Sequence, residues 1–177
     1  MIILETERLL FRPHQPGDLE PFCAMEADPE VRRYVGGAPR TREAAEQRFW
    51  DRPMLPPFAK LSMWATILKS DGTYIGRCGL YPHMVDNTPI PGEAALGFYL
   101  ARPYWGQGLA TEAATAFVAF GFNELDLTRI VTTVQTGNAA SAHILEKLGF
   151  TITSHESGIR SFDHFELLCP TIRQDSK

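Results

Sequence analysis

Cysteine is scarce in this chain, and the three that occur, Cys23, Cys78 and Cys169, stand far apart along its 177 residues. Isolated cysteines without paired spacing build neither a disulfide framework nor a zinc site. The scarcity fits a reducing compartment, and we therefore expect a cytoplasmic protein.

Long apolar runs and an excess of positive charge are also missing. No stretch approaches the ~20 apolar residues of a membrane span, and residues 1–8 carry acids where a signal peptide needs cations. The net charge of −4 argues against a protein that binds nucleic acid by neutralising its phosphates. We expect a soluble protein with no membrane and no nucleic acid among its partners.

The length fits one domain, since domains commonly contain ~100–200 residues. Hydrophobic residues make up 44% of the chain and charged residues 21%, so its composition is that of a globular protein, and it has no internal repeat. We expect a single domain over residues 1–177, with a polar tail at Gln174–Lys177 that frays.

The first third of the chain predicts a strand and three short helices. Leu4–Arg12 reads as the strand, which ends at Pro13. The helix start signals are Asp18, then Asp28 with Pro29, whose helix stops at Gly36 and Gly37, and then Thr41, whose helix runs to about Asp51. Three prolines within Arg52–Pro57 predict an irregular connection after them.

The middle of the chain predicts an antiparallel meander. Its strands are Met63–Leu68, Tyr74–Tyr81 and Glu93–Leu100, joined by a turn at Ser70–Thr73 and a loop over Pro82–Gly92.

The last third changes to an alternation of helix and strand. A helical pattern follows from Leu109 to Phe120, and the β-branched run Ile130–Val134 comes next, which indicates a βαβ crossover. A second helix over Asn138–Leu148 ends at Gly149. The closing hairpin consists of Phe150–Ser154 and Phe162–Leu168.

A glycine loop, Trp105–Thr111, lies between a predicted strand and a predicted helix, where free backbone N–H groups and the helix dipole favour an anion. Gly106 and Gly108 would let the backbone approach a pyrophosphate closely, although a tight connection explains such a loop equally well. A Rossmann fingerprint would need a small residue at Thr111 and an acid near Gln135, and the Gly-Lys-Ser/Thr of a P-loop is absent. Neither nucleotide-binding fold fits.

Several segments together resemble one family, the GNAT superfamily of acyl-CoA-dependent N-acetyltransferases, and within it the ribosomal-protein N-acetyltransferases of the RimJ/RimL type. They are Leu100–Ala113, Asn138–Ser141, Glu146–Phe150 and the opening Leu4–Leu9 with Arg12. The resemblance implies an α+β (mixed α/β) fold, in which a twisted, mainly antiparallel seven-stranded sheet contains a βαβ cofactor-binding unit and is flanked by helices. It also implies acetyl-CoA as cosubstrate and no metal.

In that family the pantetheine arm lies along a strand and bonds to its backbone, here at Phe98, Tyr99 and Leu100, and a bulge at Gly97 would separate this strand from the next. The pyrophosphate would rest on the amides of Trp105, Gly106, Gln107, Gly108, Leu109, Ala110 and Thr111. The Asn138 side chain would bond the pantetheine, and it is equally suited to cap the last helix. Both roles can hold together.

The resemblance also suggests the groups that handle protons in acetyl transfer. A backbone N–H near Phe98 or Tyr99 would stabilise the oxyanion. Many relatives protonate the thiolate with a tyrosine where this chain has Leu145, whereas the RimL-like branch uses a serine three residues after the asparagine, which Ser141 matches. A polar residue near a helix cap is the alternative reading of Ser141.

The general base is harder to place. Another Rim branch carries a glutamate where this chain has Thr133. Glu93 is the first candidate, because it precedes Phe98 on a strand whose open face should border the acceptor, and a solvated charge at a strand end is the alternative. His83 is the second candidate.

Two other kinds of chemistry are disfavoured. No pair among His143, His155, His164 and Glu166 has the i, i+4 spacing of a helical metal site. Cys78 lies within a strand without a histidine signal nearby, which argues against a covalent intermediate.

We therefore expect direct transfer of an acetyl group from acetyl-CoA to a primary amine, either a protein N-terminus or a small molecule. The chain is compatible with a homodimer. An α-amine, with pKa ~7.7–8.0, is much more often neutral at pH 7 than a lysine amine at ~10.4, so weakly basic acceptors are favoured. Because Leu145 and Thr133 replace catalytic groups of other branches, the alternative is a non-catalytic acetyl-CoA-binding regulatory or interaction module.

Overall fold

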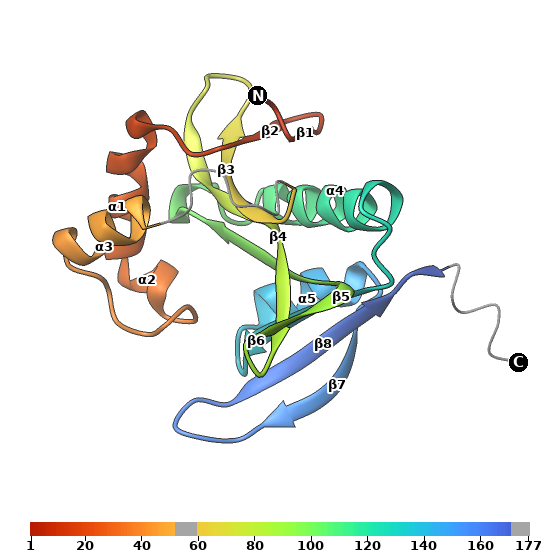
Figure 1. Ribbon diagram of the computed structural model, residues 1–177. Helices are drawn as coiled ribbons and strands as arrows, with labels where there is room; N and C mark the ends of the chain where they lie inside the picture. The colour runs from red at the N-terminus through yellow and green to blue at the C-terminus, as the bar shows by residue number, and fades with distance from the viewer. Residues whose placement is uncertain (52–59, 171–177) are drawn as a thin grey trace, which may run out of the picture.

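The computed structural model describes residues 1–51 and 60–170. The irregular connection predicted over Arg52–Pro57 and the tail predicted at Gln174–Lys177 lie outside the described residues. Within them, one mixed sheet runs through the molecule in the order β1-β2-β3-β4-β5-β6-β8-β7, and all neighbouring strands are antiparallel except β5 and β6 (Figure 1). The sheet is mainly antiparallel and carries a βαβ unit, as expected.

The described sheet has eight strands and not seven. They are β1 (Leu4–Glu5), β2 (Leu9–Arg12), β3 (Ser62–Leu68), β4 (Tyr74–Val85), β5 (Thr88–Leu100), β6 (Arg129–Gln135), β7 (Thr151–Glu156) and β8 (Phe162–Leu168). The extra strand arises because the single strand predicted over Leu4–Arg12 folds back on itself. Thr6 Oγ1 accepts a hydrogen bond from the Leu9 amide at 3.0 Å, and the turn that this bond closes pairs β1 with β2.

The prediction of a loop over Pro82–Gly92 is wrong. β4 and β5 continue through this stretch and meet in a two-residue turn, in which Asp86 and Asn87 have φ of 48° and 59°. Positive φ at both central residues matches the twist of a tight hairpin, and Asp and Asn tolerate it. The prolines that suggested a loop are accommodated because the pairing shifts register between Pro82 and Met84, where a ladder hydrogen bond is dispensable.

The described residues form five α-helices and two short 3₁₀ turns. They are η1 (Pro16–Asp18), α1 (Leu19–Ala27), α2 (Pro29–Arg32), α3 (Arg42–Trp50), η2 (Arg102–Tyr104), α4 (Leu109–Glu124) and α5 (Ala139–Lys147). Asp28 and Thr41 cap α2 and α3 with their side-chain oxygens, as predicted. Asp18 precedes α1 but does not cap it with its side chain, because its carboxylate instead receives two hydrogen bonds from Arg12, at 2.6 and 2.8 Å. No described helix is long and apolar enough to cross a membrane.

The two faces of the sheet are covered differently. On one face, α4 and α5 pack against a core that includes Leu80, Leu96, Phe117 and Leu145, each at most 1% exposed. On the other face, α1 places Phe22 and Glu26 against Arg77 of β4. The helices α1–α3 form a group apart from α4 and α5 (Figure 1).

Candidate active site

A cavity opens where the two parallel strands separate. β5 and β6 pair only from Glu93 to Ala95, opposite Arg129–Val131. Thr132 Oγ1 donates to the Leu96 carbonyl at 2.9 Å and closes the inner end of the gap. The ladder between β4 and β5 remains regular at Gly97, so the strands separate without the bulge expected there.

The cavity has a volume of about 260 Å³ and no charged side chain in its described lining. It is lined by Leu96–Tyr99 of β5, Thr132–Gln135 of β6, Asn138 and Ser141 at the start of α5, Phe162 of β8, and Tyr34–Gly36 after α2. Backbone on two sides and uncharged side chains suit an uncharged, amide-bearing chain such as pantetheine.

The predicted pantetheine strand is only partly in contact with this cavity. Phe98 and Tyr99 line it. The Tyr99 ring lies over the guanidinium of buried Arg77, 4.9 Å from its centre, which fixes this part of β5. Leu100 lies beyond the lining, and its carbonyl already accepts a hydrogen bond from Trp105 Nε1 at 2.7 Å.

The glycine loop has the geometry of an anion seat. Gly106 and Gly108 adopt left-handed backbone with φ of 71° and 77°, and Gly108 caps α4 without any side-chain hydrogen bond to the first-turn amides. A Cβ added at Gly106 would meet no atom within 4 Å, so the outer face of the loop is open. Amides at a helix N-terminus that have no internal partner are donors for phosphate oxygens. The residues present therefore fit the pyrophosphate of acetyl-CoA.

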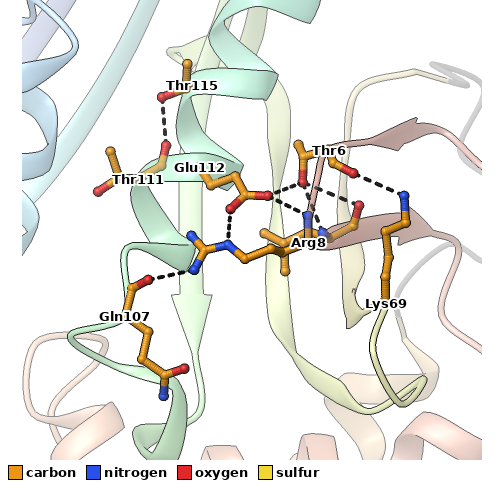
Figure 2. Close-up of polar contacts among 8 residues, drawn as sticks. Thr6, Arg8, Lys69, Gln107, Thr111, Glu112 and Thr115 are labelled. Atoms are coloured by element: carbon orange, nitrogen blue, oxygen red, sulfur yellow. Dashed lines mark hydrogen bonds and ion pairs between the residues drawn. The ribbon is translucent and has the colours of Figure 1, made fainter.

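This loop is held by a residue that the sequence reasoning did not single out. Arg8 donates from Nε to Glu112 Oε2 at 2.6 Å and from Nη1 to the Gln107 carbonyl at 3.0 Å (Figure 2). Thr6 and the Arg8 amide both donate to Glu112 Oε1. The turn between β1 and β2 is thereby fastened to the glycine loop at Gln107 and to the first turn of α4 at Glu112. Because Arg8 lies 99 residues from Gln107 in sequence, local patterns could not indicate this contact.

The Glu112 carboxylate is the group that receives the hydrogen bonds from Thr6 and Arg8. Burial pushes the pKa of its carboxyl upward, but the hydrogen bonds from Thr6 and Arg8 outweigh burial and hold that pKa below its usual value. The carboxylate is ionised at neutral pH and also complements the positive end of the helix dipole.

The start of α5 brings two predicted residues into the cavity. Asn138 Oδ1 accepts a hydrogen bond from the Ser141 amide at 3.2 Å, so the asparagine caps the helix. Its Nδ2 has no hydrogen-bond partner among the described residues and is available to a ligand. Ser141 lines the same cavity with its hydroxyl uncommitted within the described part of the chain. Leu145 is 0% exposed and belongs to the core, so it takes no part in chemistry.

Residues 8–151 match the family model described as "Acetyltransferase (GNAT) domain". The chain belongs to the GNAT acetyltransferase family. It is an N-acetyltransferase, as the resemblance in its sequence predicted.

Its relatives agree with that assignment. This GNAT enzyme is 33% identical to p20 of Bacillus licheniformis, named an uncharacterized N-acetyltransferase, over 85% of this chain and 83% of p20. The structure of a GNAT-family acetyltransferase from Bacillus anthracis matches 95% of this chain and 98% of its own, with a TM-score of 0.80 and 24% identity. The structure of RimL, the ribosomal L7/L12 α-N-protein acetyltransferase, in complex with coenzyme A matches 95% of this chain and 98% of its own, with a TM-score of 0.78 and 14% identity. The last two likenesses concern the fold.

Glu93 and His83, the two residues considered as bases, lie outside the cavity lining of this GNAT enzyme. Glu93 Oε2 is 2.8 Å from Arg129 Nη2 and 2.7 Å from His83 Nδ1. Burial would raise the pKa of Glu93, yet the hydrogen bonds from Arg129 and His83 lower it below its usual value. A carboxylate held in this way is a weak base, and the geometry gives no support to its catalytic role.

Two further sequence expectations concern nucleophiles and metals. Cys78 is fully buried, and burial raises the pKa of its thiol far above the usual value, which makes the thiolate inaccessible. Within residues 1–51 and 60–170, no group of three His, Cys, Asp or Glu side chains is arranged to hold a metal ion.

Proposed function

We propose that this enzyme transfers an acetyl group from acetyl-CoA to a primary amine by direct attack of the amine on the thioester. The observation that carries the proposal is that one βαβ unit holds both an open glycine loop and a gap between its parallel strands. The open glycine loop before α4 suits a pyrophosphate, and the gap between β5 and β6 suits the pantetheine. Ser141 and Asn138 stand inside that gap.

The binding part of the proposal assigns each segment a role. Backbone groups of Phe98 and Tyr99 on the separated edge of β5 would bond the pantetheine amides, and Asn138 Nδ2 would add a donor. The free amides after Gly108 would hold the pyrophosphate, with the loop kept in place by Arg8. Acetyl-CoA supplies the activated acyl group, and the chain supplies its position.

The chemical step needs three groups besides the nucleophile. As the amine nitrogen bonds to the acetyl carbon, a backbone N–H near Phe98 or Tyr99 would donate to the carbonyl oxygen, where negative charge develops. The C–S bond then breaks and its electron pair leaves with sulfur, which takes a proton from the Ser141 hydroxyl as solvent returns one to the serine oxygen. The excess proton of the amine must pass to a base or to water.

The acceptor class follows from the weak basicity of the site. Because no carboxylate stands in the described cavity lining, acceptors that are partly neutral at pH 7 are favoured. α-Amines of protein N-termini and weakly basic small molecules meet this condition. The fold shared with RimL is compatible with the first of these.

Two measurements test the proposal. Acetyl-CoA should raise the melting temperature, because a ligand that binds only the native state stabilises it. A panel of peptide N-termini, amino acids and polyamines is then screened for release of free CoA, and the initial rates with the best acceptor should give intersecting double-reciprocal lines. Parallel lines would contradict direct attack, and binding of acetyl-CoA without turnover on any amine would identify a non-catalytic binding module.

A further inference from the structure

The described lining of the cavity offers no acid or imidazole to take the proton of the attacking amine, but one lining residue is connected to such a group. Thr133 of β6 lines the cavity, and its register partner across the sheet is His164 of β8. Thr133 Oγ1 lies 3.3 Å from His164 Nδ1. A hydroxyl within the site is therefore in hydrogen-bond contact with an imidazole just outside it.

The second ring nitrogen of His164 determines the direction of this hydrogen bond. His164 Nε2 lies 3.3 Å from Glu156 Oε2 of β7. A carboxylate can only accept a hydrogen bond, so Nε2 carries the ring proton and donates the hydrogen bond to Glu156. This leaves Nδ1 of the neutral ring as an acceptor. The Thr133 hydroxyl then donates to Nδ1, and the lone pairs of its oxygen remain for a donor in the cavity.

Other charged groups lie near His164. Glu166, two residues along β8 and therefore on the same side of the sheet, is paired with Arg129 of β6 at 3.1 Å. Asp163 points to the opposite side and is bound to His155 of β7 at 2.8 Å. Glu156 is thus the carboxylate that orients His164.

We propose that Thr133 and His164 form the proton relay that serves the acceptor amine, with Glu156 orienting the imidazole. This inference rests on the proposed function and supplies the base that it lacks. As the N–C bond forms, a proton of the amine passes to Thr133 Oγ1 while the Thr133 hydroxyl proton passes to His164 Nδ1, so the relay gains one proton in total. The thiolate takes its own proton from Ser141, which regains one from solvent, and His164, which is partly exposed, returns its proton to solvent.

Thr133 is the group that touches the substrate, and His164 acts through it. The relay explains how a chain with threonine at this position can still remove a proton. A hydroxyl alone is too weak a base, but a hydroxyl that donates to a neutral imidazole can accept a proton as it gives up its own.

The test measures kcat/KM for an α-amine peptide, or for the best acceptor found, from pH 5 to 9 in the wild type and in His164→Gln. In the wild type both the amine and the imidazole must be neutral, so log kcat/KM should fall with a slope of two at the acid end. His164→Gln should lower kcat/KM at pH 7.5 by about 10²-fold, the low end for a lost base, and reduce the acid slope to one. The KM for acetyl-CoA should stay within about twofold, because His164 does not contact the cofactor cavity.

The same hairpin provides a matched control. His155 is also paired with a carboxylate, Asp163, but lies outside the cavity lining, so His155→Gln should keep both the rate and the slope of two. Thr133→Val should reproduce the loss and the changed slope of His164→Gln, and the double variant should be no slower than either single one, since both interrupt one relay.

The relay is refuted if His164→Gln retains kcat/KM within threefold of the wild type, or if its acid limb keeps a slope of two. It is also refuted if Thr133→Val behaves as the wild type. These outcomes leave the proposed function intact because the wild type turns over in the same assay. Absence of turnover in the wild type on every acceptor would overturn the proposed function and the relay together.

Discussion

Replacing Gly108 by valine tests the anion seat directly. A β-branched residue is disfavoured at φ of 77°, and the left-handed conformation costs an L-residue about 1–2 kcal/mol. There is no steric clash to add to this cost, because an added Cβ would lie 3.5 Å from Arg8 Nη2, an ordinary contact. The protein should therefore fold, with a melting temperature about 2–8 °C lower, at ~2–4 °C per kcal/mol for a chain of this size.

The loop can relieve that strain only by rotating out of the left-handed conformation, which turns the first-turn amides of α4 away from the phosphate position. At 100 times the dissociation constant, acetyl-CoA stabilises the wild type by about 2.7 kcal/mol, which corresponds to a rise of about 5–11 °C. In Gly108→Val this rise should vanish. Differential scanning fluorimetry with and without acetyl-CoA measures both quantities.

Gly72, in the turn between β3 and β4, provides the control. It has a similar φ of 74°, no atom within 4 Å of an added Cβ, and no part in the glycine loop. Gly72→Val should therefore lower the melting temperature of the free protein to a similar extent and keep the full response to acetyl-CoA. If Gly108→Val responds to acetyl-CoA as strongly as Gly72→Val, the loop does not hold the pyrophosphate.

Two further variants probe the acid and the loop support. Ser141→Ala should lower kcat by about 10²–10⁴-fold and leave the acetyl-CoA dissociation constant within about threefold, and a kcat within threefold of the wild type at saturating acceptor would remove Ser141 from the mechanism. Glu112→Gln should destabilise the protein by about 1 kcal/mol at pH 7, as judged by urea denaturation. Because the pKa of Glu112 is lowered by folding, its stabilisation is present above the unfolded value of 4.5 and is lost as the pH falls below it. The difference between variant and wild type should therefore shrink at pH 3, and an undiminished difference would mean that the carboxylate charge is not what stabilises the loop.

Much of the architecture was predictable because its signals are local. The helix caps Asp28 and Thr41 are read within one turn, and Gly149 ends α5 with φ of 86°, as its position after a helical pattern predicts. The change from strand to helix period after Leu100 likewise marks the βαβ unit. The errors at Leu4–Arg12 and Pro82–Gly92 occurred where a tight turn lacked its usual glycine and where prolines were accommodated by a register shift.

The family, the glycine loop and the positions of Asn138 and Ser141 could be predicted from the sequence, because these depend on residue types at fixed spacing within one βαβα segment. Which charged groups lie near the site depends on the tertiary structure. It engages Glu93 in a pair with Arg129, fastens Arg8 to the glycine loop, and sets His164 beside Thr133. Such contacts join residues about 30 to 100 positions apart, and they depend on strand order and register, which no local pattern specifies.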